Sequence, residues 1–308
     1  IQQYNLTEEQ YRGNRFVGCN KLQKGNNDLL TLTQPAIIKE IHKEYLAAGA
    51  DIIETNTFNA TSVSMEEYGM QRVVAEINRE ATRLAREVAD EFTRWTPDKP
   101  RFVAGAVGPT NKTLSMSPRV EEPMYRDISF EQLCASYEEQ IDALVEGSVD
   151  ILLVETVFDT LNAKAALFAA QKVFDKQGRV VPIMLSVTLS DKAGRTLSGQ
   201  TIEGFMTSVS HARLLSIGLN CSFGATEMKP HLKQLKRISP VWVSAYPNAG
   251  LPNQMGEYDE TPDRMAAHIE GFVKEGLVNI VGGCCGTSPA HIAKLVDIVE
   301  GVKPPTPE

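Results

Sequence analysis

Three of the five cysteines stand where parallel strands are predicted to end. Cys284 and Cys285 are adjacent, follow the apolar run 278–281 and have glycine on both sides of the pair; Cys221 follows the run 215–219. Neighbouring residues of a regular strand point to opposite faces, but flanking glycines let the backbone leave the strand and turn both sulfurs toward one point. Three thiolates meeting there would form a zinc site one ligand short of a closed structural site.

A zinc ion held by three thiolates has a restricted chemistry. Zinc has no redox activity, so it acts as a Lewis acid or it holds and ionises a nucleophile. Three anionic sulfurs make the ion a poor polariser of water and carbonyl groups, yet it still lowers the pKa of an incoming thiol from about 8.5. The bound thiolate remains nucleophilic. This donor set therefore favours alkyl transfer to a substrate sulfur over hydrolysis.

Two other interpretations of the three cysteines remain open, because they could be small buried apolar residues or a redox pair. Cys19 is expected in a loop and Cys134 in a helix, and neither is given a function. The histidines are expected in or beside helices, away from the strand ends: His42, His211, His231, His268 and His291.

Acidic and amide side chains follow other predicted strands. Glu54 and Glu155 close two of them, Asn220 precedes Cys221, and Asn248 lies just after another strand. In a (β/α)₈ barrel the carboxyl ends of the strands form the active site, so we expect these four residues to bind a small polar substrate. Both carboxylates have a structural alternative, which is to accept hydrogen bonds from neighbouring backbone N–H groups.

Short β-branched runs alternate with longer amphipathic segments along the chain. Strands are predicted at residues 50–54, 102–106, 150–155, 183–187, 215–219, 241–245 and 278–281. Helices are predicted at residues 35–48, 72–92, 130–146, 161–174, 227–235, 262–275 and 289–299. This alternation indicates parallel strands joined by helical crossovers, and seven strands without an interrupting linker fit a (β/α)₈ TIM barrel whose first strand is missing.

The two ends of the chain differ from its middle. Residues 1–24 are polar and are expected to form a loop, so the first strand of the barrel is expected to lie before Ile1. Residues 302–308 contain three prolines, cannot continue a helix and are typical of the start of an interdomain linker. We therefore expect an N-terminally truncated barrel domain at residues 1–301, followed by a linker.

Composition excludes several classes of protein. The 308 residues are 42% hydrophobic and 23% charged, as in ordinary globular proteins. A net charge of -8 argues against a nucleic-acid partner. No apolar run approaches the roughly 18 residues of a membrane span, and the chain does not open on a positively charged region followed by an apolar stretch, so no membrane partner is expected. Free thiols that bind metal fit a reducing, cytoplasmic environment.

Several motifs together resemble a known family. The segments 218–221 (GLNC) and 282–286 (GGCCG) are similar to the zinc signature of the homocysteine S-methyltransferases. Six longer segments, and with them essentially the whole chain, resemble the N-terminal homocysteine-binding module of the cobalamin-dependent methionine synthases: 24–28 (KGNND), 51–58 (DIIETNTF), 108–113 (GPTNKT), 155–161 (ETVFDTL), 194–200 (GRTLSGQ) and 247–253 (PNAGLPN).

The resemblance implies a site and a reaction. Cys221, Cys284 and Cys285 would ligate Zn²⁺, and the homocysteine sulfur would complete the tetrahedron as the only reacting group at the metal. Glu155 would hold the substrate ammonium by a charge-assisted hydrogen bond. We also expect Asn248 to give its amide oxygen to zinc when no substrate is bound. In the family a further acidic residue follows the first strand, a part of the barrel that this sequence does not include.

The resemblance also implies partners beyond this chain segment. Methylcobalamin would be supplied by a cobalamin-binding module of the same polypeptide and recharged from methyltetrahydrofolate on a folate-binding module. Methyl transfer to homocysteine would then give methionine.

Three rival functions remain. One is a freestanding homocysteine methyltransferase that uses betaine or S-methylmethionine. Such cationic donors favour an aromatic cage, however, and the chain has only two tryptophans and scattered tyrosines with which to build it. Another is a non-catalytic zinc-binding scaffold. A third is a (β/α)₈ aldolase or lyase that uses Glu54 and Glu155 for acid–base chemistry.

Overall fold

The computed structural model describes residues 1–307 and contains one parallel sheet. Its seven strands follow one another in chain order: β1 (Ile52–Glu54), β2 (Phe102–Val107), β3 (Ile151–Val157), β4 (Ile183–Val187), β5 (Ser216–Asn220), β6 (Trp242–Tyr246) and β7 (Ile280–Val281). The registers of β1 with β2, and of β4 to β7 with one another, are all parallel. The predicted α/β fold, a (β/α)₈-like arrangement with one strand fewer, is confirmed.

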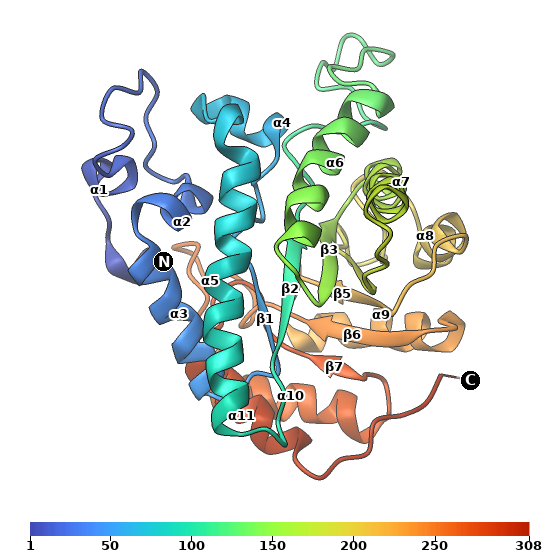
Figure 1. Ribbon diagram of the computed structural model, residues 1–308. Helices are drawn as coiled ribbons and strands as arrows, with labels where there is room; N and C mark the ends of the chain where they lie inside the picture. The colour runs from blue at the N-terminus through green and yellow to red at the C-terminus, as the bar shows by residue number, and fades with distance from the viewer. Residues whose placement is uncertain (308) are drawn as a thin grey trace. The chain divides into compact units, whose positions relative to one another are not determined.

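Helices follow the strands as the apolar periodicity predicted (Figure 1). The long ones are α3 (Pro35–Ala47), α5 (Val74–Trp95), α6 (Phe130–Glu146), α7 (Thr160–Gln177), α9 (Ala225–Ile238), α10 (Pro262–Lys274) and α11 (Pro289–Val299). Two short helices, α2 (Leu30–Thr33) and α4 (Ser62–Met65), lie in connections, as do 3-10 helices at Asn27–Leu29, Glu66–Tyr68 and Gln71–Val73. The sequence did not predict α8 (Ile202–Val209), which begins after the capping residue Thr201.

The prediction that residues 1–24 form only a loop is wrong. They contain a 3-10 helix at Gln2–Tyr4 and the helix α1 at Glu8–Arg12. The side chain of Thr7 accepts a hydrogen bond from the backbone N–H of Gln10. In return, the side chain of Gln10 accepts a hydrogen bond from the backbone N–H of Thr7. This capping box satisfies two backbone donors at the start of α1 and stabilises a helix too short for a periodic apolar pattern.

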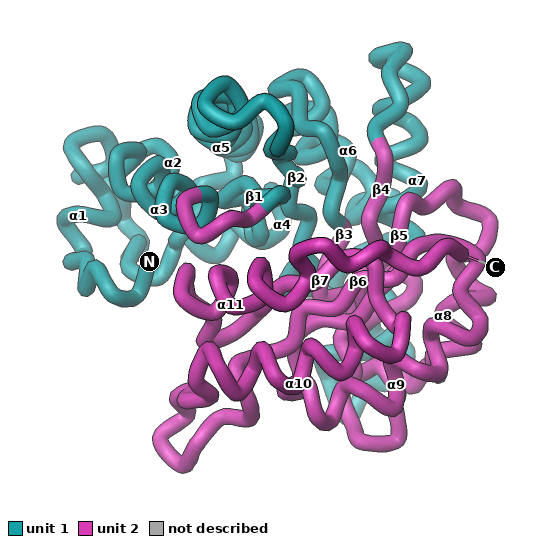
Figure 2. Tube along the Cα trace, turned by 90° about the horizontal axis from the view of Figure 1, so that it is seen from below, with its two compact units in different colours: residues 1–46, 51–153, 164–181 teal, residues 47–50, 154–163, 182–308 magenta. Residues whose placement is uncertain are grey.

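The chain divides into two compact units, which Figure 2 distinguishes by colour. Unit 1 comprises residues 1–46, 51–153 and 164–181, and unit 2 comprises residues 47–50, 154–163 and 182–308. In unit 1, α5 packs on α6 and on β2. One apolar cluster of unit 1 gathers buried side chains from the segments before α5 and from its first turn: Leu29, Ala60, Met65, Met70, Val74 and Ile77.

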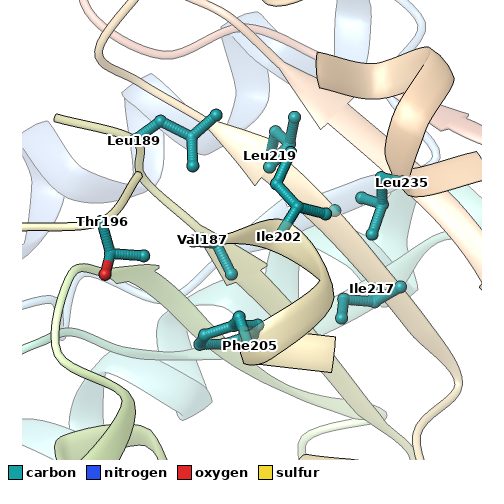
Figure 3. A pocket seen from close by; sticks show the side chains of 9 residues that line it. Val187, Leu189, Thr196, Ile202, Phe205, Ile217, Leu219 and Leu235 are labelled. Carbon is teal, nitrogen blue, oxygen red and sulfur yellow. The ribbon is translucent and has the colours of Figure 1, made fainter. Parts of the chain in front are cut away.

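Unit 2 contains β4 to β7 with α8, α9, α10 and α11, and α10 packs beside α11 (Figure 1). A small hollow lies between the strands β4 and β5 and the helices α8 and α9 (Figure 3). It is lined almost entirely by apolar side chains, among them Val187, Ile202, Phe205, Leu219 and Leu235. It is part of the packed interface between the sheet and its helices and offers no cluster of polar groups for a ligand.

Residues 302–307 follow α11 without regular structure, and Asn279 Nδ2 donates to the carbonyl of Pro305 at 2.5 Å. The predicted domain limit at residue 301 and the linker at 302–308 stay predictions, and Glu308 lies outside the described residues. Within residues 1–307, every helix is too short or too polar to cross a bilayer.

Candidate metal centre

Three cysteine sulfurs meet within unit 2. The Sγ atoms of Cys221, Cys284 and Cys285 all lie within 4.8 Å of one another, and those of Cys221 and Cys285 are 3.8 Å apart. A tetrahedral zinc ion with Zn–S bonds of about 2.3 Å would separate its sulfur ligands by about 3.8 Å. The three donors therefore fit zinc with the fourth position left for another ligand. Among the described residues, no second cluster of this kind was found.

The backbone turns sharply where β5 and β7 end. Cys221 and Ser222 directly follow β5 with φ angles of 58° and 59°, in the left-handed region that non-glycine residues rarely adopt. After β7, a Cβ at position 283 would lie 2.2 Å from Thr287 Cγ2, so glycine is required there. Cys284 N–H then donates to the carbonyl of Pro247 at 2.8 Å. As predicted, the glycines before the cysteine pair take the chain out of the strand.

The three thiols change one another's pKa because they lie in contact. Hydrogen bonds from Cys284, and then from Cys285, lower the pKa of Cys221. The hydrogen bond to Cys221 raises the pKa of both Cys284 and Cys285, and the negative charge on Cys221 raises it further, because a second thiolate would lie beside the first. Full ionisation of the trio therefore requires a neighbouring positive charge, which a divalent cation provides.

Asn248 borders the cysteines from the segment after β6. Its side chain is buried, with 1% exposed, and its Oδ1 accepts a hydrogen bond from the backbone N–H of Cys285 at 3.1 Å. Its amide also hydrogen-bonds to Cys221 and helps to lower the pKa of that thiol. Asn248 thus contacts both cysteine segments through its side chain. Its predicted roles, as a substrate contact and as a zinc ligand in the substrate-free state, stay predictions.

Glu155 lies in β3 and is 5% exposed. Its Oε2 accepts a hydrogen bond at 3.1 Å from the hydroxyl of Tyr246, the last residue of β6. Asn220 is the last residue of β5 and lies beside Tyr246 in the parallel register of β5 and β6. Its amide hydrogen-bonds to Thr156, the residue after Glu155. The structure therefore brings Glu155, Asn220, Asn248 and the cysteines together in unit 2.

Glu54 is in a different unit. It is the last residue of β1 in unit 1 and has an exposed side chain. Its predicted contact with substrate stays a prediction.

Sequence reasoning did not single out two tyrosines. Tyr246 hydrogen-bonds to Glu155, and the Tyr258 phenol hydrogen-bonds to Cys285. Burial and the neighbouring Cys285 raise the pKa of Tyr258, so its hydroxyl stays protonated and can donate to sulfur. Tyr246 directly follows the predicted strand at residues 241–245, and this position at a strand end was the available signal. Tyr258 lies 12 residues after Tyr246 in a polar loop that offered none.

Among the described residues, the other cysteines and the histidines are not members of the cluster of three sulfurs. Cys134 is buried in α6, and its Sγ donates to the carbonyl of Ala165 at 3.6 Å. Four histidines are within helices and His211 lies just after α8. His291, near the start of α11, caps that helix by accepting a hydrogen bond from Ser288 N–H at Nδ1.

Known proteins resemble this chain in sequence and in fold. A family model described as homocysteine S-methyltransferase matches residues 1–299. The oxidised form of the homocysteine methyltransferase MmuM from Escherichia coli is similar in structure, with a TM-score of 0.71 and 20% identity over 91% of this chain and 90% of that chain. Its metallated form gives a TM-score of 0.68 and 22% identity over 90% of each chain. At these identities, the two structures support the fold.

Proposed function

Because the chain belongs to the homocysteine S-methyltransferase family, we propose that it binds zinc through Cys221, Cys284 and Cys285 and catalyses the S-methylation of homocysteine to methionine. The observation that carries the proposal is the cluster of three sulfurs at the ends of β5 and β7, all within 4.8 Å of one another. Three thiolate ligands with an open fourth position suit the activation of a substrate thiol.

Each part of the site has a distinct task in this proposal. Zinc, when bound, would keep the homocysteine sulfur ionised at neutral pH. Cys221, Cys284 and Cys285 hold the ion and contribute the negative charge that keeps this sulfur nucleophilic. Glu155 faces the substrate ammonium, and because this carboxylate is buried, its charge-assisted hydrogen bond is strong. Tyr246 fixes the carboxylate by donating to Oε2.

For the methyl donor we propose methylcobalamin, recharged from methyltetrahydrofolate, with both carried by other modules of the same polypeptide. The support is the resemblance of the six longer sequence segments to cobalamin-dependent methionine synthases. The test is transfer to homocysteine from methylcobalamin, betaine and S-methylmethionine in parallel. Transfer from methylcobalamin alone is expected, and transfer from either of the other donors alone would replace this part of the proposal.

The metal site is tested by X-ray absorption at the zinc edge with and without homocysteine. Three sulfur neighbours are expected in the free protein and four in the complex. Unchanged coordination would mean a closed, non-catalytic zinc site. Activity that survives complete removal of zinc by a chelator would instead favour acid–base chemistry.

A pair of serine variants tests the ligands. Cys284→Ser is expected to lose zinc and methyl transfer, because a neutral hydroxyl replaces a thiolate ligand. Cys134→Ser is the matched control, since its side chain is buried in α6 and can still donate to the carbonyl of Ala165. Zinc content and activity should stay at the wild-type level in the control. Full zinc content and activity in Cys284→Ser would contradict the proposed ligand set.

A further inference from the structure

The side chain of Asn220 uses all of its hydrogen-bonding capacity within the protein. Oδ1 accepts from the backbone N–H of Thr156 at 3.1 Å and from the hydroxyl of Ser186 at 2.7 Å. Nδ2 donates to Thr156 Oγ1 at 2.9 Å and lies 4.0 Å from Cys284 Sγ. An amide offers two acceptor positions and two N–H donors, so all four are occupied. Asn220 is also 1% exposed, so it presents little surface to a ligand.

The orientation of this amide follows from its partners. The backbone N–H of Thr156 can only donate, so the Asn220 atom that faces it must be the oxygen. The nitrogen then necessarily points to Thr156 Oγ1 and to Cys284 Sγ. One planar group therefore connects the end of β3, the strand β4 and the segment after β7.

Thr156 needs such a partner because its backbone is strained. Its φ angle is 57°, and a β-branched residue in this left-handed region is unfavourable by roughly 1–2 kcal/mol. Two hydrogen bonds with Asn220 hold this conformation: the Thr156 backbone N–H donates to Asn220 Oδ1, and Asn220 Nδ2 donates to Thr156 Oγ1. Glu155 directly precedes Thr156, so the orientation of the peptide group between them depends on the φ angle of Thr156. The direction of the Glu155 carboxylate therefore depends on Asn220.

We propose that Asn220 is a positioning residue that holds Thr156 in the left-handed conformation, and thereby aims Glu155 at the substrate ammonium, without touching the substrate itself. Its second N–H faces Cys284 Sγ and steadies that sulfur as a metal ligand. The inference rests on the proposed function, since it assigns Glu155 to homocysteine. It replaces the expectation that Asn220 contacts the substrate.

The test is a double-mutant cycle between Asn220→Ala and Thr156→Gly, read by homocysteine affinity of the zinc-loaded protein in calorimetry. Glycine adopts positive φ without strain, so it removes the need for the hydrogen bonds from Asn220. Asn220→Ala is expected to raise the homocysteine dissociation constant about tenfold with Thr156 present, a change of about 1.4 kcal/mol. In the Thr156→Gly background, Asn220→Ala should raise the homocysteine dissociation constant about threefold or less, which corresponds to about 0.7 kcal/mol.

The alternatives predict other results. A residue that contacts homocysteine directly would lose the same factor with or without Thr156→Gly, and this outcome would overturn the proposal. So would unchanged affinity in Asn220→Ala. A second readout needs no ligand. The losses of unfolding free energy in urea should also be coupled between positions 220 and 156. If the two losses simply add, Asn220 does not hold Thr156 and the proposal is overturned. If the wild-type protein binds no homocysteine, the proposed function fails, while the coupling in urea still reports on Asn220.

Asn220→Asp tests the contact with sulfur. The carboxylate keeps both acceptor bonds of Oδ1, and the Thr156 hydroxyl can rotate to donate to the oxygen that replaces Nδ2, but Cys284 Sγ then faces an oxygen in place of an N–H donor. Zinc should then be held about tenfold more weakly in competition with a chelator. Equal zinc affinity in Asn220→Asp and wild type would refute the role at Cys284.

Discussion

Gly286 is a position where one added methyl group should disturb the metal centre. It follows Cys285 directly and has a φ angle of 79°. A Cβ built there would lie 2.3 Å from Tyr258 Cβ and 3.3 Å from Ala249 Cβ. A separation of 2.3 Å is far below van der Waals contact and involves the first atom of the Tyr258 side chain, which no rotamer change can move. In Gly286→Ala the backbone itself must therefore shift, and Cys285 with it.

Gly256 provides a control with matched backbone geometry. Its φ angle is 78° and a Cβ there would meet no atom within 4 Å. Gly256→Ala should therefore cost only the left-handed strain of an alanine, roughly 1–2 kcal/mol. Gly286→Ala adds overpacking, typically about 1–3 kcal/mol. The expected loss of unfolding free energy is about 2–5 kcal/mol, together with weakened zinc binding.

The assay is urea unfolding of both variants, with zinc content measured on the same samples. Adding Tyr258→Gly to Gly286→Ala should recover the packing part of the loss, because it removes the Cβ and the ring that clash. The reasoning is refuted if Gly286→Ala destabilises the protein no more than Gly256→Ala and retains full zinc. It is also refuted if Tyr258→Gly gives no recovery.

Three further predictions concern charge and redox state. Glu155→Gln should raise KM for homocysteine about tenfold and change kcat much less, because a neutral amide loses the charge-assisted bond to the ammonium; steady-state kinetics with an unchanged KM would contradict this. Burial raises the pKa of Asp28 to about 7, so between about pH 4 and 7 the unfolded chain releases a proton that the folded protein keeps, and stability falls as pH rises. Asp28→Asn should match wild type near pH 4 and exceed it at pH 8 by up to about 4 kcal/mol in urea unfolding, whereas a constant difference would refute the burial argument. After removal of zinc, a mild oxidant should join Cys221 to Cys285, whose sulfurs are 3.8 Å apart, and peptide mapping that finds only free thiols would contradict this.

Local sequence patterns predicted most elements of the fold. The strand at residues 183–187 and the helices at 130–146 and 289–299 have the predicted limits, because apolar periodicity and capping residues act over a few positions. The same local chemistry signals α1, whose Thr7 and Gln10 form a capping box, but five residues are too few for the periodicity on which the prediction relied.

The sequence by itself determined the three thiols, the glycines beside them and the alternation that brings strand ends to one edge of a parallel sheet. Only the tertiary structure decided which polar groups meet there. Asn220 and Thr156 are 64 residues apart, and Tyr246 and Glu155 are 91 apart. Their contacts depend on the register of the strands and on left-handed φ angles at Thr156 and Cys221. Such angles are imposed by hydrogen bonds from distant segments, and no local preference of threonine or cysteine predicts them.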